Sequence, residues 1–239
     1  LMIGGSMGVN VLNYVYHLIM GRLLGPSEYG VLASVYTILY IVSIVPQSAS
    51  VTIVKFISSA PDQKSRNHIY HRINILVRKV SVVGSVILLL LLPFLQRFLN
   101  IQSIWPVVWI IPVYYFSIVT IANQATLQGV LSFLGVVTTN FLSSFVKLAL
   151  GVILVLIGWA AGGAVFAVGA GVAFSFFLSK QFIKGYIQEP GSDENEFEIA
   201  KFIKYSGPVI VQALAFTSLF TVDLILVKHF FPDLIRSAL

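Results

Sequence analysis

The hydrophobic residues of this chain gather in long runs separated by short polar segments. Seven of these runs approach or exceed the roughly 18 to 20 residues that an α-helix needs to cross the hydrocarbon core of a membrane. They predict helices at about 2–21, 30–54, 80–98, 105–127, 136–157, 160–179 and 208–230. The sequence therefore predicts an all-α polytopic membrane protein.

The order of these helices divides the chain into three parts. We predict an N-terminal six-helix transmembrane lobe over 1–180, a cytoplasmic inter-lobe linker over 181–207, and the first helix of a truncated second lobe over 208–239. Two interpretations stay open for the linker. It either forms an amphipathic helix on the membrane interface, capped by Ser192 or Asp193, or it is a solvated acidic connection. Both ends of the chain read as cut, so we expect a piece of a longer protein without a signal peptide.

Charge gives these helices an orientation. Only 10% of the residues are charged, and the net charge of +6 is attributed to Lys and Arg on the cytoplasmic side rather than to nucleic-acid binding. Ten basic residues fall in two segments on one side of the predicted bundle: Lys55, Lys64, Arg66, Arg72, Arg78, Lys79, Lys180, Lys184, Lys201 and Lys204. We therefore predict a multi-pass protein of the cytoplasmic membrane with a cytoplasmic N-terminus. The turn "GRLLGPSEYG" at 21–30 then faces outward.

Polar residues recur at helical spacing inside five of the predicted spans, whereas the third span has almost none and is expected to face lipid. Steps of three and four residues place such side chains on one face of a helix. Two interpretations stay open: hydrogen bonds between helices, or a shared polar cavity. The stripes are Ser6, Asn10, Asn13 and His17; Ser43, Gln47 and Ser50; Ser117, Thr120, Gln124 and Gln128; Asn140, Ser143 and Lys147; and Gln212 and Asp223.

Two charged residues within the spans stand out. Lys147 lies close to the middle of its helix, where a cation needs a partner or water. It either forms an ion pair that holds helices together or binds an anionic substrate. Asp223 lies several residues before the end of the last span, and its side chain is expected to face another helix. In the sixth span, Gly163, Ala167, Gly171 and Ser175 at four-residue steps predict close helix packing.

Several short motifs resemble the prokaryotic oligosaccharide flippases, the polysaccharide-transporter branch of the multidrug/oligosaccharidyl-lipid/polysaccharide exporter superfamily. The matching stretches are "GRLLGPSEYGVLAS" after the first span, "LQG" at 127–129, "FVKLALGVILVLIG" at 145–158, "KYSGPVIVQALAFTSL" at 204–219 and "TVDLILVKHFF" at 221–231. The resemblance implies two lobes of helices around a central cavity. It also implies transport of polyprenyl-pyrophosphate-linked oligosaccharide by alternating access. The end of the chain, "PDLIRSAL", departs from the family pattern, which has a glycine-tyrosine pair after the proline.

On this hypothesis each polar residue has an expected role. Lys147 and Arg22 would bind the anionic head group, and Asn10, Asn13, Gln124 and Asn140 would contact sugar hydroxyls. His17 and Asp223 would couple transport to an ion gradient, because their charge can change with bound ions. The partners would be lipid-linked oligosaccharide, membrane lipids and a polysaccharide polymerase or export machinery. We expect no catalytic residue, cofactor, metal or nucleic acid.

Three other hypotheses remain. A multidrug exporter of the same superfamily would have a cavity richer in acids and aromatics. A membrane-embedded glycosyltransferase or polymerase would need clustered acids or a metal site, and His68 and His71 have no carboxylate or third ligand nearby in the sequence. Finally, the lobe could serve as a non-transporting partner or a truncated product.

Overall fold

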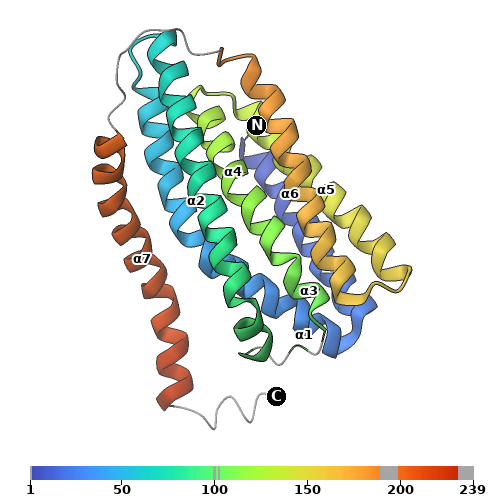
Figure 1. The fold of residues 1–239 in the computed structure, drawn as a ribbon. Coiled ribbons are helices and arrows are strands. Elements are labelled where there is room, and N and C mark those ends of the chain that lie inside the picture. Colours follow the sequence, from blue (N-terminus) through green and yellow to red (C-terminus); the bar gives the residue numbers. More distant parts are fainter. Residues whose placement is uncertain (1, 99–100, 102, 189–198, 231–239) are drawn as a thin grey trace.

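The structure is a computed structural model that describes residues 2–98, 101, 103–188 and 199–230 (Figure 1). Within these ranges it omits the side chains of Val45, Leu214 and residues 216–230. Every element is a helix, which confirms the all-α prediction: α1 (Met2–Ser58), α2 (Gln63–Phe98), α3 (Trp105–Val108), α4 (Ile110–Gly129), α5 (Phe133–Leu156), α6 (Ala160–Lys184) and α7 (Ile199–Phe230).

The long element α1 consists of two antiparallel arms that meet at Gly25. Gly25 has φ 71° and ψ 175°, in a region that favours glycine because a Cβ would clash there. The ring of His17 lies 4.9 Å from the ring of Tyr36, whereas one straight helix would separate these residues by about 28 Å. The two arms correspond to the predicted spans 2–21 and 30–54.

The predicted start of the third span was wrong, because α2 begins at Gln63 rather than near residue 80. The carboxylate of Asp62 accepts a hydrogen bond from the Ser65 amide at 2.8 Å, which caps the helix. Hydrogen bonds from Ser65 hold the pKa of the Asp62 carboxyl below its usual value. The extra turns pack Ile69 and Ile73 against the end of α1. The basic residues from Lys64 to Lys79 therefore lie in a helix.

The boundaries near the linker also differ from the prediction. The sixth helix runs to Lys184 rather than to 179. The last helix begins at Ile199 and passes through Pro208 without a break, so the end of the predicted linker and the predicted span form one helix. The predicted caps Ser192 and Asp193 lie outside the described residues.

Helices α1 to α6 form one bundle, with α7 at its side (Figure 1). α5 packs on α6, α6 on α4, and α4 on α2, while α1 contacts α4, α5 and α6. α7 contacts α1 through Phe202, whose ring lies 5.8 Å from that of Phe56, and through Tyr205, whose ring lies 3.6 Å from the Lys55 ammonium. Five of the described helices are long and apolar enough to cross a membrane, and one of these is the two-armed α1.

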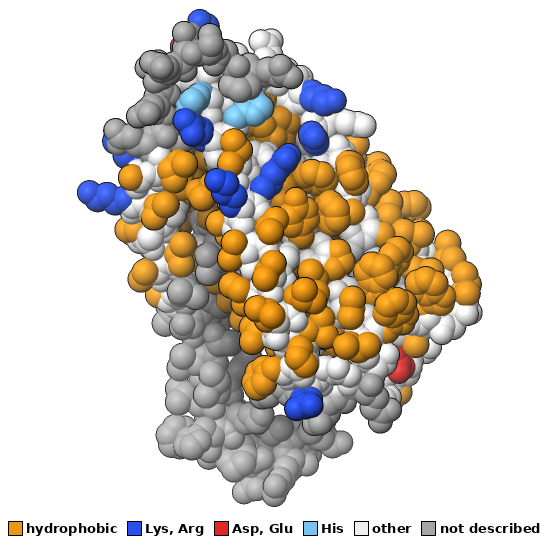
Figure 2. Space-filling view, in the orientation of Figure 1, with side chains coloured by type: hydrophobic (Ala, Val, Ile, Leu, Met, Phe, Trp, Pro, Cys, Tyr) orange, Lys and Arg blue, Asp and Glu red, His pale blue; other side chains and the backbone are white. Residues whose placement is uncertain are grey.

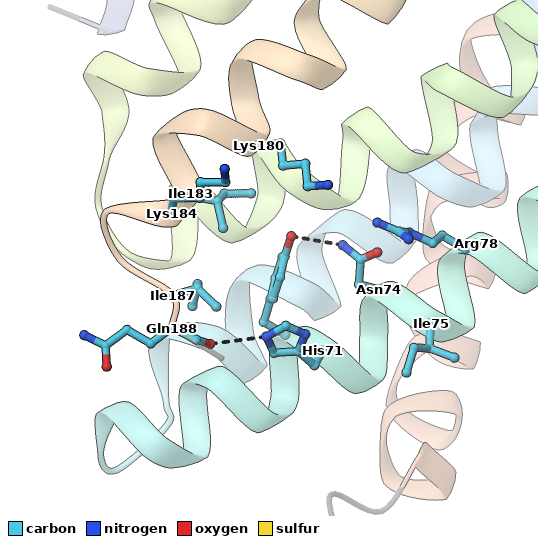
Figure 3. A pocket seen from close by; sticks show the side chains of 10 residues that line it. His71, Asn74, Ile75, Arg78, Lys180, Ile183, Lys184, Ile187 and Gln188 are labelled. Atoms are coloured by element: carbon cyan, nitrogen blue, oxygen red, sulfur yellow. Dashed lines mark hydrogen bonds between the residues drawn. The ribbon is translucent and has the colours of Figure 1, made fainter. Parts of the chain in front are cut away.

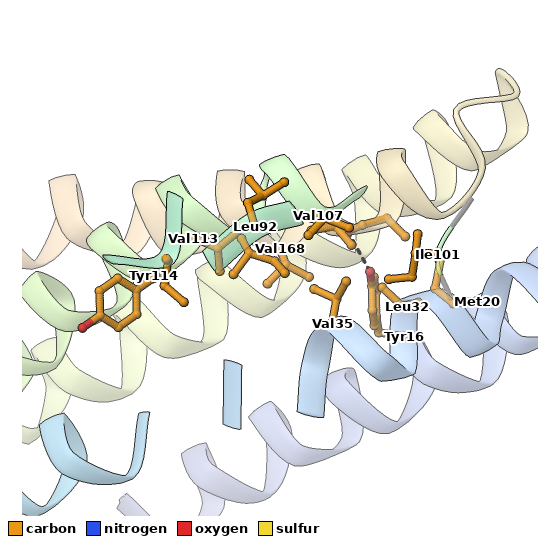
Figure 4. Close-up of a cluster of buried hydrophobic side chains, with 14 of the residues drawn as sticks. Tyr16, Met20, Leu32, Val35, Leu92, Ile101, Val107, Val113, Tyr114 and Val168 are labelled. Carbon is orange, nitrogen blue, oxygen red and sulfur yellow. Dashed lines mark hydrogen bonds between the residues drawn. The ribbon is translucent and has the colours of Figure 1, made fainter. Parts of the chain in front are cut away.

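A buried hydrophobic cluster joins α1, α2, α4 and α6 (Figure 4). Tyr16 is fully buried in it and donates a hydrogen bond from its hydroxyl to the carbonyl of Ala164 at 3.0 Å. This bond satisfies a polar group that would otherwise be costly to bury. Val113 and Val168 belong to the cluster and also line a cavity, so the packed core gives way there to open space.

The face shown in Figure 2 is largely hydrophobic, and its Lys and Arg side chains gather mainly near one end. On α2, apolar residues such as Val82, Val86 and Leu90 are at least half exposed, as expected of a helix that faces lipid.

Candidate functional site

A central cavity of about 340 Å³ lies between the second arm of α1, α4, α5 and α6. Its walls combine apolar side chains with hydroxyl and amide groups. The polar lining residues are Tyr36, Tyr40, Ser43, Gln47, Ser117, Thr120, Gln124, Asn140, Ser143 and Ser175. Three of the predicted polar stripes therefore meet in one cavity, together with two tyrosines and a serine that the sequence reasoning did not assign to it.

An amide network crosses the cavity wall. The Gln124 side-chain nitrogen donates to Asn140 Oδ1 at 2.6 Å and to Ser175 Oγ at 3.3 Å. These residues come from α4, α5 and α6, so one glutamine connects three helices. The network brings together two predicted sugar-contacting residues, Gln124 and Asn140, and leaves part of each exposed to the cavity.

A second, smaller cavity of about 220 Å³ adjoins the first at Asn140. Asn10 and Ser6 from the first arm of α1 line it, together with Gln128 from α4. Asn140 lines both cavities, so the structure places Asn10 close to the same amide network.

Lys147 occupies the interface between α5 and the first arm of α1. Its ammonium donates a hydrogen bond to Asn13 Oδ1 and lies 4.6 Å from the centroid of the Tyr16 ring. Both partners are neutral, and the ring stabilises the cation through its electron-rich face. Among the described side chains Lys147 makes no ion pair, so they do not support the interpretation as an ion pair that holds helices together. Lys147 does not itself line the central cavity, but it lies one helical turn from Ser143, which does.

His17 lies in an aromatic cluster in the hairpin of α1. Its Nδ1 atom is 3.3 Å from the Tyr29 hydroxyl, and the rings of Tyr16 and Tyr36 pack edge-on against it. Tyr36 also lines the central cavity, so the cluster connects the imidazole to that cavity. Sequence reasoning missed these tyrosines because aromatic residues in a membrane span normally read as packing.

Of the other two predicted residues, only Arg22 has a described side chain, and it lies apart from this cluster. Arg22 is exposed near the end of the first arm of α1, about 9 Å along the helix axis beyond Tyr16. Asp223 belongs to α7, but its side chain lies outside the described residues. The structure does not bring Arg22 into contact with Lys147.

Glu28 is a structural contact that the sequence did not reveal. Its Oε2 atom accepts a hydrogen bond from the Ala161 amide at 3.0 Å, in the first turn of α6. A carboxylate at a helix N-terminus satisfies a free amide and complements the helix dipole. The turn at 21–30 is thereby joined to the start of α6.

A family model described as "Polysaccharide biosynthesis protein" matches residues 1–233 of the chain. The chain belongs to this family. A search of curated proteins finds no match to this polysaccharide biosynthesis family member.

Solved structures show the fold to which the family member is similar. A MOP superfamily transporter from Pyrococcus furiosus, described as having a binding pocket of reverse polarity, superposes with TM-score 0.78 at 15% identity, over 95% of this chain and 55% of that chain. A multidrug resistance MATE family transporter in an outward-facing conformation gives TM-score 0.74 at 18% identity, over 92% and 53%. A MATE point mutant gives TM-score 0.77 at 17% identity, over 95% and 55%.

These likenesses show the fold of multi-pass membrane transporters. The chain spans about half the length of the transporters that it matches. Among the residues that the structure describes, no group of three or more His, Cys, Asp or Glu side chains could hold a metal ion.

Proposed function

We propose that the protein transports polyprenyl-pyrophosphate-linked oligosaccharide from the cytoplasmic to the outer leaflet of the cytoplasmic membrane by alternating access, for export of cell-surface polysaccharide. This chain would supply the six-helix N-terminal lobe and the first helix of a second lobe. The observation that carries the proposal is the cavity lined by amides and hydroxyls in a polysaccharide biosynthesis family member. Amides and hydroxyls are the groups that can replace the water around sugar hydroxyls inside a membrane.

Lys147 is the proposed ligand for the pyrophosphate. Its contacts are with Asn13 and Tyr16, and no carboxylate among the described side chains compensates its charge. Holding such a cation within a membrane span costs about 3 kcal/mol, and a phosphate anion would offset that cost through charge-assisted hydrogen bonds. Arg22 would contact the head group on the outward side. Asn10, Gln124 and Asn140 would contact sugars from the cavities that they line. Asn13, which accepts a hydrogen bond from Lys147, would contact sugars next to the pyrophosphate.

Ion coupling is assigned to His17 and Asp223. The His17 imidazole contacts Tyr29 and Tyr36, and Tyr36 lines the central cavity. A change in the protonation of His17 would therefore alter the position of Tyr36 at the substrate site. The proposed partners remain lipid-linked oligosaccharide, membrane lipids and a polymerase or export machinery.

A multidrug exporter is the second candidate, because one of the similar structures is a multidrug resistance transporter. The aromatic residues Tyr36 and Tyr40 in the cavity suit planar organic cations. Against this candidate, none of the described residues that line the cavity is acidic.

Lipid-linked oligosaccharide flipping by the complete protein in proteoliposomes separates the two candidates. We expect Lys147→Met to reduce the initial flipping rate about 10- to 100-fold, because it removes a charge-assisted hydrogen bond to the substrate. Lys79→Met, at an exposed lysine of α2, is the matched control and should keep the full rate.

Efflux of a fluorescent cationic dye is measured on the same preparations. Dye efflux without oligosaccharide flipping would establish the exporter and overturn our proposal. Full flipping by the Lys147→Met protein would instead leave the activity standing and remove Lys147 from the site.

A further inference from the structure

A basic pocket of about 590 Å³ opens between α2 and the C-terminal end of α6 (Figure 3). Three cations line it, Arg78 from α2 and Lys180 and Lys184 from α6. Its apolar lining comes from Ile75, Ile183 and Ile187. None of these residues lines the central cavity, so the basic pocket is a separate site and does not depend on the proposed function.

Hydrogen bonds between the two helix ends hold the basic pocket in shape. Gln63 donates to the carbonyl of Tyr186, and His71 Nε2 donates to the carbonyl of Gln188 at 3.2 Å. Asn67 Oδ1 accepts from the Gln188 amide at 3.3 Å. These contacts join residues more than 100 positions apart in the sequence, so the pocket is built by the tertiary fold rather than by one flexible loop.

The neutral polar groups of the basic pocket bond to one another, whereas its cations do not. Asn74 donates to the Tyr70 hydroxyl at 3.0 Å on the floor of the pocket. Among the described residues, no hydrogen bond or ion pair is made by the side chains of Arg78, Lys180 or Lys184. Figure 3 shows Arg78 and Lys180 extending from opposite helices toward the same space. Two like charges that converge there repel unless an anion lies between them.

The surface beyond the basic pocket is apolar in the direction of the membrane. On α2, Val82 and Val86 follow Arg78 by one and two helical turns on the same face, and both are about half exposed, at 51% and 50%. On α6, Phe177 precedes Lys180 by three residues and is 59% exposed. Figure 2 shows the same pattern, with most of the basic side chains of this face near one end and hydrophobic side chains below them. A ligand held here would contact cations at one end and hydrocarbon at the other.

We propose that the basic pocket binds the phosphate head group of an anionic membrane phospholipid, whose acyl chains lie along the exposed apolar faces of α2 and α6. A phosphodiester accepts hydrogen bonds from a guanidinium and from ammonium groups at once. Basic pockets between transmembrane helices at a membrane surface are suited to such head groups. The bound lipid joins the N-terminal part of α2 to the C-terminal end of α6 and neutralises the repulsion between their cations.

Binding of defined lipids to the complete protein in a neutral detergent, measured by native mass spectrometry, tests this site. We expect phosphatidylglycerol to bind more tightly than phosphatidylcholine with the same acyl chains. The triple variant Arg78→Gln/Lys180→Gln/Lys184→Gln should weaken phosphatidylglycerol binding by about a hundredfold, since each cation near the surface contributes about fivefold. All three side chains are exposed, so these substitutions leave the packed core intact.

A matched triple variant, Lys64→Gln/Arg72→Gln/Lys79→Gln, removes the same charge from the same end of the protein without touching the basic pocket and should keep the preference for phosphatidylglycerol. Equal loss in both triple variants, or no loss in the pocket variant, would overturn the proposal. Glycerophosphoglycerol, the head group without acyl chains, should bind at least tenfold more weakly than the lipid. Equal binding would show that the ligand is a soluble phosphate and not a lipid.

Discussion

At the scale of single residues, the turn at 21–30 has two determinants that act in different ways. Gly25 permits the reversal, since its φ of 71° is costly for a residue with a Cβ. Glu28 anchors the reversal, because its carboxylate accepts the Ala161 amide at the start of α6. The first determinant is readable in the sequence as turn chemistry, whereas the second depends on α6 lying beside the turn.

Replacing Glu28 tests the anchoring contact. We expect Glu28→Ala to lower the free energy of unfolding in mixed micelles by about 1 kcal/mol, the usual effect of losing a side-chain cap together with its charge–dipole interaction. Glu28→Gln should lose less, since its amide oxygen can still accept the hydrogen bond.

The neighbouring Ser27→Ala is the control, because Ser27 is exposed in the same turn. If Glu28→Ala and Ser27→Ala have the same free energy of unfolding, the contact between Glu28 and α6 does not contribute to stability.

At the scale of helices, small residues set how closely α6 approaches its neighbours. Gly163, Ala167, Gly171 and Ser175 are all buried, which agrees with the close packing predicted from their spacing. Gly171 faces α5, and a Cβ built there would lie 2.8 Å from the Ser143 carbonyl oxygen and 3.1 Å from Lys147 Cβ. The distance between α5 and α6 at the level of Lys147 therefore depends on this glycine.

A methyl group at that position should separate the two helices. We expect Gly171→Ala to destabilise the protein by about 1–3 kcal/mol, because the nearest atom belongs to the backbone and cannot rotate away. The free energy of unfolding in mixed micelles measures this effect. Gly4→Ala is the control, since nothing lies within 4 Å of its added Cβ and alanine is the better helix former. Equal stability of the two variants would show that α5 and α6 can move apart at no cost.

At the scale of the whole molecule, the separation of charge between the two ends predicts its orientation. The basic end holds the start of α2 and the end of α6, and the turn at 21–30 lies at the opposite end (Figure 1). Because Lys and Arg accumulate on the cytoplasmic side, we expect the basic end to face the cytoplasm.

Single cysteines report this orientation directly, since the chain contains no cysteine of its own. In intact cells a membrane-impermeant maleimide should label Ser27→Cys and leave Lys64→Cys unlabelled. Permeabilised cells should label both, which controls for reactivity. Labelling of Lys64→Cys alone in intact cells would invert the orientation and place the N-terminus outside.

Particular elements show where prediction from sequence stopped. The apolar runs located the spans, yet the start of α2 was misplaced by 17 residues, because hydropathy detects the part of a helix inside lipid and not its extension into water. Asp62 before a polar, helix-compatible segment was the available signal. The polar stripes left open hydrogen bonds between helices or a shared cavity; the structure shows both, because three of the stripes line one cavity and Gln124 bonds across helices within it. The tyrosines around His17 were not predicted, because a tyrosine gives the same sequence signal whether it packs in a core or faces a cavity.

The sequence by itself determined that this protein is a helical membrane protein, because a bilayer demands runs of about 20 apolar residues whatever their neighbours are. It also determined which helix faces carry polar groups, since that depends only on spacing along one helix. Only the tertiary structure decided which of these polar groups meet. Gln124 bonds to Asn140 and Ser175, and Lys147 contacts Asn13 and Tyr16. Arg78 and Lys180 share one pocket. Those contacts depend on the rotation and relative height of separate helices, which side-chain packing sets and periodicity does not.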